Sequence, residues 1–86
     1  FYKTQVRLYY AAVLEELERY DDALKAIQGI EVGEDQTLGA RVMLAHGRLL
    51  GLLGKKEEGT KILNELALKY ANSAEASKAR AMKLMW

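Results

Sequence analysis

The chain has 86 residues, the size of one domain, and at this length folding hides only about 60% of the surface that an unfolded chain exposes. It contains no cysteine, which excludes disulfides, thiolate metal sites and thiol nucleophiles. Thirteen Lys and Arg residues against twelve Asp and Glu give a net charge of +1 without the clustered cations that phosphate binding needs, so we expect no nucleic-acid partner.

The chain also lacks the pattern of a membrane-inserted segment. No apolar run approaches the roughly 20 residues of a membrane span, so we expect no direct membrane insertion by this segment. The first residue, Phe1, is not an initiator Met, and Trp86 stands in the middle of an amphipathic pattern. We therefore expect the sequence to be part of a longer protein.

The composition favours helices, because Pro is absent and Ala, Leu, Glu and Lys dominate. The first predicted helix covers about residues 2–18. Its apolar residues recur three and four positions apart, which predicts one buried face. These residues are Val6, Tyr10, Val13, Leu14 and Leu17.

Asp21 suits the N-cap of a second helix. The apolar residues of that helix are Ala23, Leu24, Ile27 and Ile30.

The stretch from Glu31 to Gly39 has loop composition. A third helix is predicted by the apolar residues Val42, Met43, Leu44, Leu49, Leu50 and Leu53. Gly54 followed by Lys55 marks its C-terminal end.

A fourth helix is predicted by Ile62, Leu63, Leu66 and Tyr70. Ser73 suits the N-cap of a fifth helix. The fifth helix carries Ala76, Ala79, Ala81, Leu84 and Met85. Short connections between five helices predict antiparallel hairpins.

The sequence repeats itself after 36 residues. This shift places small residues on small ones and large residues on large ones. The superposed pairs are Ala11 and Gly47, Leu14 and Leu50, Ala23 and Gly59, Ile27 and Leu63, and Ile30 and Leu66. A further shift of 34 residues brings Gly47 onto Ala81 and Leu50 onto Leu84, so the fifth helix corresponds to the opening helix of a third unit. Short amphipathic hairpins must cover one another, which predicts a solenoid.

Through these residues the chain resembles the tetratricopeptide repeat family. The family pattern is large, small, large along the first helix, Gly at the turn, and Ala, aromatic, Ala along the second. The second repeat carries the pattern in Met43, Gly47, Leu50, Gly54, Gly59, Leu63 and Leu66. The first repeat carries it in Ala11, Leu14, Tyr20, Ala23, Ile27 and Ile30. In the first repeat Glu18 stands at the place of the turn Gly.

The resemblance implies an all-α fold, namely a right-handed superhelix of antiparallel helical hairpins with five helices, or two and a half repeats. Residues 1–86 then form a single domain. Repeat 1 covers about residues 4–37, repeat 2 about residues 40–73, and residues 74–86 form a partial third repeat or a capping helix.

A narrower similarity concerns the segment from Leu66 to Leu84, in which Tyr70, Asn72 and Ser73 precede an Ala-rich helix. This segment is similar to repeats in bacterial cell-envelope proteins of the Tol-Pal coordinator and outer-membrane assembly lipoprotein types. The similarity implies a bacterial source and favours the periplasm or cell envelope over the cytoplasm. The sequence alone leaves the compartment open.

In the tetratricopeptide family the first helix of each hairpin lines a concave face that binds partners. The resemblance therefore implies a set of candidate partner-binding residues on that face. These are Gln5, Tyr9, Ala12, Glu16, Arg41, Leu44, Arg48, Leu52, Lys78 and Met82, with Leu8, Glu15, Ala45 and Met85 beside them. Arg41 and Arg48 lie two helical turns apart, so both guanidinium groups can fork onto a peptide carboxylate. The alternative is structural, in which these arginines pair with Glu15 or Glu16 of the neighbouring helix.

The sequence offers little for catalysis or cofactor binding. His46, the only histidine, has no second His, Cys or carboxylate at ligand spacing, so we expect a packed side chain rather than a metal ligand. The carboxylates of Glu15, Glu16 and Glu18 lie on a polar face, without the desolvated pocket that a catalytic acid requires. We therefore expect no enzymatic activity and no cofactor.

Two functions remain open at this level. The first is a non-enzymatic scaffold that binds a peptide or a partner protein on the concave face. The alternative is a structural module that self-associates through apolar helix ends, including a homodimer through the C-terminal helix, where Met82, Met85 and Trp86 form an apolar cluster. The sequence does not identify the partner.

Overall fold

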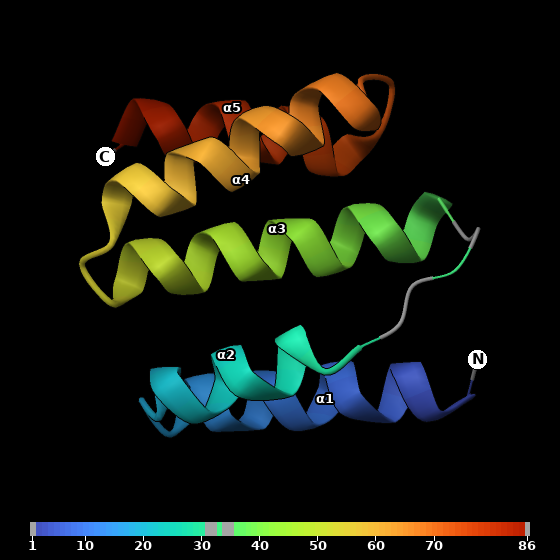
Figure 1. Cartoon of the computed structure of the whole chain (residues 1–86), viewed down its shortest axis with the longest axis vertical. Coiled ribbons are helices and arrows are strands. Elements are labelled where there is room, and N and C mark those ends of the chain that lie inside the picture. Colours follow the sequence, from blue (N-terminus) through green and yellow to red (C-terminus); the bar gives the residue numbers. More distant parts are fainter. Residues whose placement is uncertain (1, 31–32, 34–35, 86) are drawn as a thin grey trace.

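The computed structural model describes residues 2–30, 33 and 36–85, with the backbone alone for residues 2–4. The described residues form five α-helices and no strand, which confirms the expected all-α class. The helices are α1 Tyr2–Glu16, α2 Tyr20–Gln28, α3 Gln36–Leu52, α4 Lys56–Lys69 and α5 Ala74–Met85. Consecutive helices run in alternating directions (Figure 1). Within the described part of the chain, no helix combines the length and the apolar character needed to cross a membrane.

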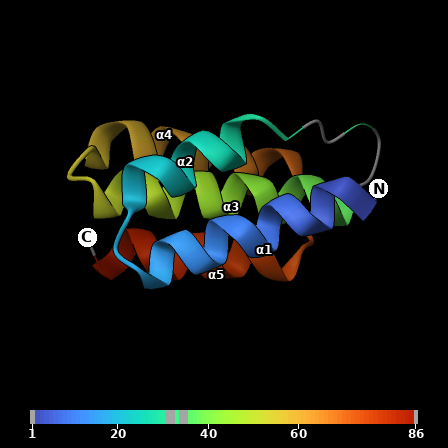
Figure 2. The same ribbon diagram turned by 90° about the horizontal axis from the view of Figure 1, so that it is seen from below.

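Helix α3 occupies the centre of the molecule. It separates the α1–α2 pair from the α4–α5 pair (Figure 1) and packs against α2, α4 and α5. Viewed from below, α2 and α4 lie on one side of the molecule, whereas α1 and α5 lie on the other (Figure 2). Helices α1 and α5 therefore share one side of the molecule, and α3 lies between the two sides.

Two clusters of buried apolar side chains share α3. The first cluster joins α1, α2 and α3, and its buried members are Ala11, Leu14, Ala23, Leu24, Ile27, Leu38, Val42, Leu49 and Leu50. The second joins α3, α4 and α5, and its buried members are Ala40, Leu63, Leu66 and Ala79. Because α3 contributes to both clusters, its apolar residues are distributed around much of its circumference, as expected for a helix with neighbours on several sides.

The turns that close the two hairpins have the same backbone geometry. Glu18, between α1 and α2, has a φ of 61°, and Gly54, between α3 and α4, has a φ of 83°. The N–H of Arg19 donates to the carbonyl of Leu14 at 2.9 Å, and the N–H of Lys55 donates to the carbonyl of Leu50 at 2.8 Å. The 36-residue shift predicted from the sequence therefore recurs in the hydrogen bonds of the backbone. Glu18 adopts a conformation that only Gly adopts without strain.

Helices α3 and α4 approach each other closely at Gly47, as the pattern of small residues predicted. A Cβ atom placed on Gly47 would lie 2.6 Å from Cδ2 of Leu63 and 3.3 Å from the carbonyl oxygen of Gly59. Ala11, at the equivalent place in α1, is buried as well, but Ala81, the third member of the series, is exposed. The small residue is therefore covered only where a partner helix packs against it.

The predicted buried face of the first helix is wrong. Of its five residues only Leu14 is buried, together with Ala11. The other four are about half exposed or more: Val6 48%, Tyr10 59%, Val13 53% and Leu17 62%. The reason is the packing of α1, which turns the side carrying Ala11 and Leu14 toward α2, while none of the described helices covers the adjacent stripe. We call these four residues the α1 stripe.

The predicted helix ends are partly correct. Ser73 caps α5 as expected, because its Oγ accepts a hydrogen bond from the Ala76 N–H at 3.1 Å. Asp21 does not cap α2. The N-cap is Arg19, without a side-chain hydrogen bond, and Asp21 lies in the first turn, where a carboxylate still interacts favourably with the helix dipole.

Other differences concern the predicted loop and the C-terminal helix. Gly39, predicted in the loop, is buried within α3. The rest of that loop lies outside the described residues, apart from residue 33 and residues 36–38. On α5, Ala76 and Ala79 are buried, whereas Leu84 of the same apolar pattern is exposed. Met85 is exposed too, as the apolar cluster at the end of the chain predicted. Trp86 lies outside the described residues.

Candidate binding face

The ten candidate partner-binding residues all lie on α1, α3 or α5, and none of them is buried. Seven are exposed, namely Gln5, Tyr9, Ala12, Glu16, Arg41, Leu52 and Lys78. The other three, Leu44, Arg48 and Met82, are half-buried. Two of these three, Leu44 and Met82, pack against the second apolar cluster, so the same side chains support the core and reach the surface.

Four of the ten residues meet in one shallow cavity of about 370 Å³ between α1 and α3. Gln5, Tyr9 and Ala12 line it from α1 together with Leu8, and Arg41 lines it from α3. We call this cavity the Tyr9–Arg41 hollow. The phenol ring of Tyr9 is 75% exposed, and Leu8 packs against the first apolar cluster below it. An aromatic ring, aliphatic carbon and one guanidinium group can together bind an apolar side chain next to an anion.

The second arginine of this face has a structural partner. Nη2 of Arg48 donates to Oε1 of Glu15 at 2.7 Å, which ties α3 to α1. This is the structural alternative expected from the sequence, and it is confirmed for Arg48. Nε of the same guanidinium is buried without a hydrogen-bond partner, so part of the stabilisation from the ion pair is offset by desolvation.

Arg41 differs from Arg48. Among the described residues, Arg41 takes part in no ion pair or hydrogen bond, and the same holds for Lys78 on α5. Glu16, Leu52 and Lys78 are exposed on the same three helices but do not line the Tyr9–Arg41 hollow. Both arginines thus lie beside α1, Arg41 in the hollow and Arg48 at Glu15. Their spacing along the chain did not indicate which of them pairs with a carboxylate of the same chain.

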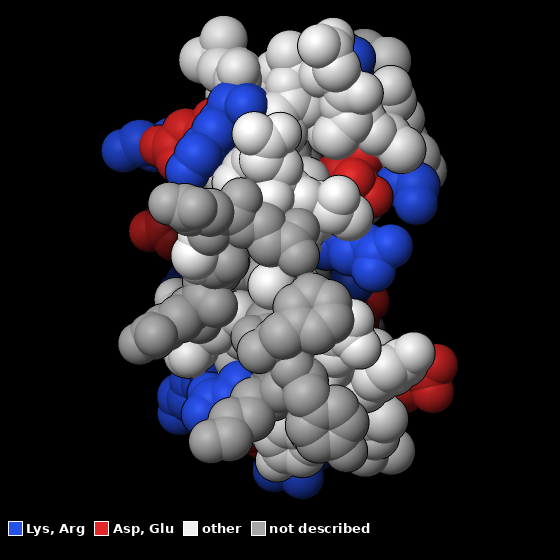
Figure 3. Space-filling model, turned by 90° about the vertical axis from the view of Figure 1, so that its right-hand side faces the viewer, with Lys and Arg blue, Asp and Glu red and all other residues white. Residues whose placement is uncertain are grey.

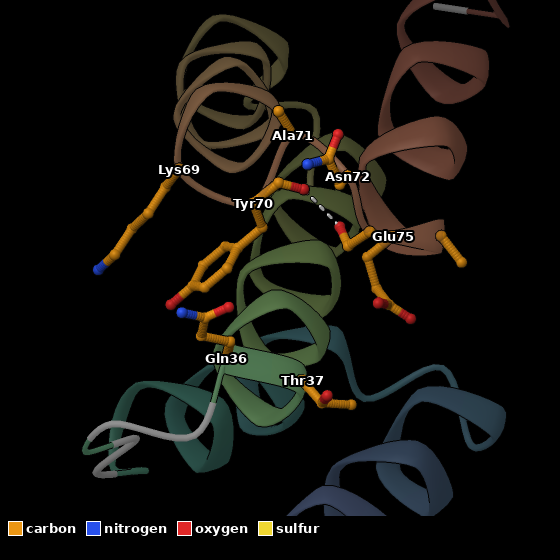
Figure 4. A pocket seen from close by; sticks show the side chains of 9 residues that line it. Gln36, Thr37, Lys69, Tyr70, Ala71, Asn72 and Glu75 are labelled. Carbon is orange, nitrogen blue, oxygen red and sulfur yellow. Dashed lines mark hydrogen bonds between the residues drawn. The ribbon is translucent and has the colours of Figure 1, made fainter.

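A second hollow, of about 380 Å³, lies where the turn between α4 and α5 meets the start of α3. Gln36 and Thr37 line it from α3, and residues 69–75 line it from the other side. The ring of Tyr70 extends toward Gln36, and the Ser73 hydroxyl donates to the Tyr70 carbonyl at 2.7 Å (Figure 4). Sequence reasoning identified Ser73 only as a cap. The turn between α4 and α5 forms one side of this hollow.

His46 lines a third hollow, of about 340 Å³, with side chains of α2 and α4. Burial lowers the pKa of His46 below its ordinary value of 6.5, and the nearby carboxylates of Glu58 and Glu65 oppose this change. The neutral imidazole is therefore favoured in the folded chain. Among the described residues, no group of three or more His, Cys, Asp or Glu side chains is placed to hold a metal ion.

The charges visible at one end of the molecule are mixed. On the face shown in Figure 3, Lys and Arg side chains lie beside Asp and Glu side chains and do not gather in one patch. At the opposite end of the molecule, in the turn between α1 and α2, Nη2 of Arg19 and Oδ2 of Asp22 form an exposed ion pair at 2.6 Å. Such exposed pairs contribute little to stability.

Comparisons of the chain with protein-family models, with curated proteins and with solved structures find no match. A functional proposal therefore depends on the arrangement of the described residues.

Proposed function

We propose that this chain is a non-enzymatic scaffold of the tetratricopeptide type that binds a peptide or a partner protein on the side formed by α1, α3 and α5. The observation that supports this function best is the Tyr9–Arg41 hollow. It combines an exposed aromatic ring with a cation that has no partner among the described residues, and exposed Tyr and Arg side chains are enriched at the centres of protein interfaces.

The tetratricopeptide arrangement itself is supported by features that recur after 36 residues. The left-handed residues at the two turns, Glu18 and Gly54, are separated by this distance, and so are the buried small residues Ala11 and Gly47. In the proposed superhelix α1, α3 and α5 are the first helices of successive hairpins, and their common side is the concave one. Small residues at the hairpin contacts fix the distance between helices and thereby the curvature.

A binding role fits the chemistry of the lining residues. Leu8 and Ala12 provide aliphatic surface, Gln5 provides an amide, and Arg41 provides a fork of N–H donors. Such a mixture favours an extended peptide, whose apolar side chains can be buried while its polar groups remain hydrogen-bonded.

The test is selection of peptides from a random display library on the 86-residue chain, followed by affinity measurements with two tyrosine variants. Tyr9→Ala removes a side chain of the hollow, whereas Tyr10→Ala removes its exposed neighbour on the same helix, outside the hollow. We expect the selected peptides to lose about 5- to 30-fold in affinity with Tyr9→Ala, equivalent to about 1–2 kcal/mol, and little with Tyr10→Ala. Failure to select any peptide, or equal losses in the two variants, contradicts the proposal.

Self-association is a second candidate, and the α1 stripe favours it. The stripe has three large apolar side chains exposed on α1 and a fourth, Leu17, just after it, which is more than isolated surface residues, and Leu84 and Met85 are exposed on α5. In this case the sedimentation coefficient rises with concentration, and Val13→Glu or Leu84→Glu abolishes the rise while leaving peptide binding unchanged. A concentration-independent monomer removes this candidate.

A further inference from the structure

We propose that the Tyr9–Arg41 hollow is selective for acidic segments, with a ligand carboxylate paired to Arg41 and an adjacent apolar side chain of the ligand against Tyr9. This inference rests on the proposed scaffold function and adds the chemical class of the partner. It follows from the difference between two arginines of α3.

The first step concerns charge. Arg41 and Arg48 are of the same residue type and lie two turns apart on one helix, yet of the two only Arg48 forms an ion pair with a described carboxylate, that of Glu15 at 2.7 Å. The other residues that line the hollow, Gln5, Leu8, Tyr9 and Ala12, carry no charge. The positive charge of Arg41 is therefore not balanced within the hollow. A guanidinium group binds carboxylates through two parallel hydrogen bonds, so a ligand carboxylate is the complementary group.

The second step concerns what lies next to the cation. Leu8 is half-buried on the first apolar cluster, and Ala12, one turn later on α1, has only a methyl group. The ring of Tyr9 stands beside them and is largely exposed. A ligand side chain that covers this ring would displace water from it and lower the local dielectric around Arg41. The attraction between the guanidinium and a carboxylate then exceeds that of a fully solvated pair.

The third step concerns the direction of the ligand. The repeat shifts superpose Leu8 on Leu44 and Leu44 on Lys78, so Lys78 occupies the corresponding place on α5. Lys78 is exposed and, within the described part of the chain, has no ion pair. The place of Lys78 is thus that of Leu44, one turn beyond Arg41 in the repeat, so a segment that continues from the hollow over α5 has a second cation available. Glu75, in the first turn of α5, is half-buried and forms no ion pair with Arg41.

The experiment uses two synthetic peptides with the same leucine positions, one alternating leucine with aspartate and the other alternating leucine with asparagine. Both carry a fluorophore, and binding to the 86-residue chain is followed by fluorescence anisotropy at low and at physiological salt. Arg41→Gln removes the proposed partner of the carboxylate. Arg80→Gln is the matched control, because Arg80 is also exposed but points about 200° around α5 from Lys78 and Met82. Circular dichroism establishes that both variants remain helical.

We expect the unmodified chain to bind the aspartate peptide about 5-fold more tightly than the asparagine peptide, with a smaller ratio at higher salt. Arg41→Gln should bring the ratio to about 1, and Arg80→Gln should leave it unchanged. A ratio near 1 in the unmodified chain, or one that survives Arg41→Gln, overturns the acidic selectivity. If library-selected peptides still bind in a Tyr9-dependent manner, the scaffold function stands without it. If no peptide of any kind binds, both proposals fail.

Discussion

Helices α1 and α3 occupy equivalent places in the repeat, yet their equivalent residues have different environments. The 36-residue shift superposes the α1 stripe on Val42, His46 and Leu49 of α3 and on Leu53 just after it. Val13 is 53% exposed, whereas Leu49 is 1% exposed. The difference arises because α2 covers this side of α3, while no described helix covers the same side of α1. Apolar spacing thus marks a face that can be buried, and the neighbouring helix decides whether it is.

The test with the largest expected effect replaces the two equivalent residues, Leu49 and Val13, by alanine. Leu49→Ala leaves a cavity in the first apolar cluster and should lower the free energy of unfolding by about 2–5 kcal/mol. Val13→Ala should cost less than about 1 kcal/mol, because half of this side chain is already in water. Urea denaturation followed by circular dichroism measures both values. Equal losses at the two positions would show that the α1 stripe is covered in solution.

The second test concerns the close approach within the α3–α4 hairpin. Gly47→Ala places a methyl group against Leu63 and should destabilise the fold by about 1–3 kcal/mol, partly offset by up to about 1 kcal/mol of helix propensity. The cost should largely disappear in a Leu63→Ala background, where the methyl group has room. Thermal unfolding of the single and double variants measures this coupling. A Gly47→Ala protein as stable as the original contradicts the contact.

The third test compares the two turns. Glu18→Gly should stabilise the chain by about 0.5–1 kcal/mol, because glycine adopts a positive φ without the steric cost that a side chain incurs. Gly54→Ala should destabilise it by about 1 kcal/mol for the same reason. Midpoints of urea denaturation give both changes. Changes of the same sign would mean that the two turns do not share their geometry in solution.

The fourth test concerns the ion pair that joins the two hairpins. Glu15→Gln and Arg48→Gln should each lower the free energy of unfolding by roughly 0.5–1 kcal/mol, since both side chains keep some contact with water. In a double-mutant cycle, the two losses should not add. Additive losses would assign the effects to something other than the contact between Glu15 and Arg48.

The smallest expected effect concerns pH. The pKa of His46 is lowered in the folded chain, so below pH 6.5 the unfolded chain binds the proton more readily. The free energy of unfolding should therefore keep its full value well above pH 6.5 and decline as the pH falls below about 6.5. His46→Gln should flatten this decline, whereas Tyr10→Gln, at the equivalent place in α1, should not. A pH dependence that persists with His46→Gln assigns the decline to other groups.

Local features of the fold could be predicted because short stretches of the chain specify them. The helix end at Gly54, the cap at Ser73 and the small residue at Gly47 depend on φ preferences, on nearby hydrogen bonds and on side-chain volume. The predicted N-cap at Asp21 was wrong. Helix α2 begins at Tyr20, which places the Asp21 carboxylate in the first turn instead of at the N-cap.

The candidate face was predicted in outline but not in detail. The resemblance to the tetratricopeptide family implied that Gln5, Tyr9, Ala12 and Arg41 share one face, and the structure brings these four together in a hollow. The sequence allowed either arginine to pair with Glu15 or Glu16, but no pattern along the chain indicated that Arg48 would form this pair and that Arg41 would have none among the described residues. That choice depends on how α1 lies across α3, and residues 33 positions apart make the contact.

The sequence by itself determined five helices, the turns between hairpins and the 36-residue register of small residues, because these follow from interactions over a few residues and from a repeated pattern. Only the tertiary structure decided which side of α1 faces water, which of Arg41 and Arg48 pairs with a carboxylate, and which side chains form the hollow. These properties depend on helices packed together from distant parts of the chain, and burial and charge pairing are set by those neighbours.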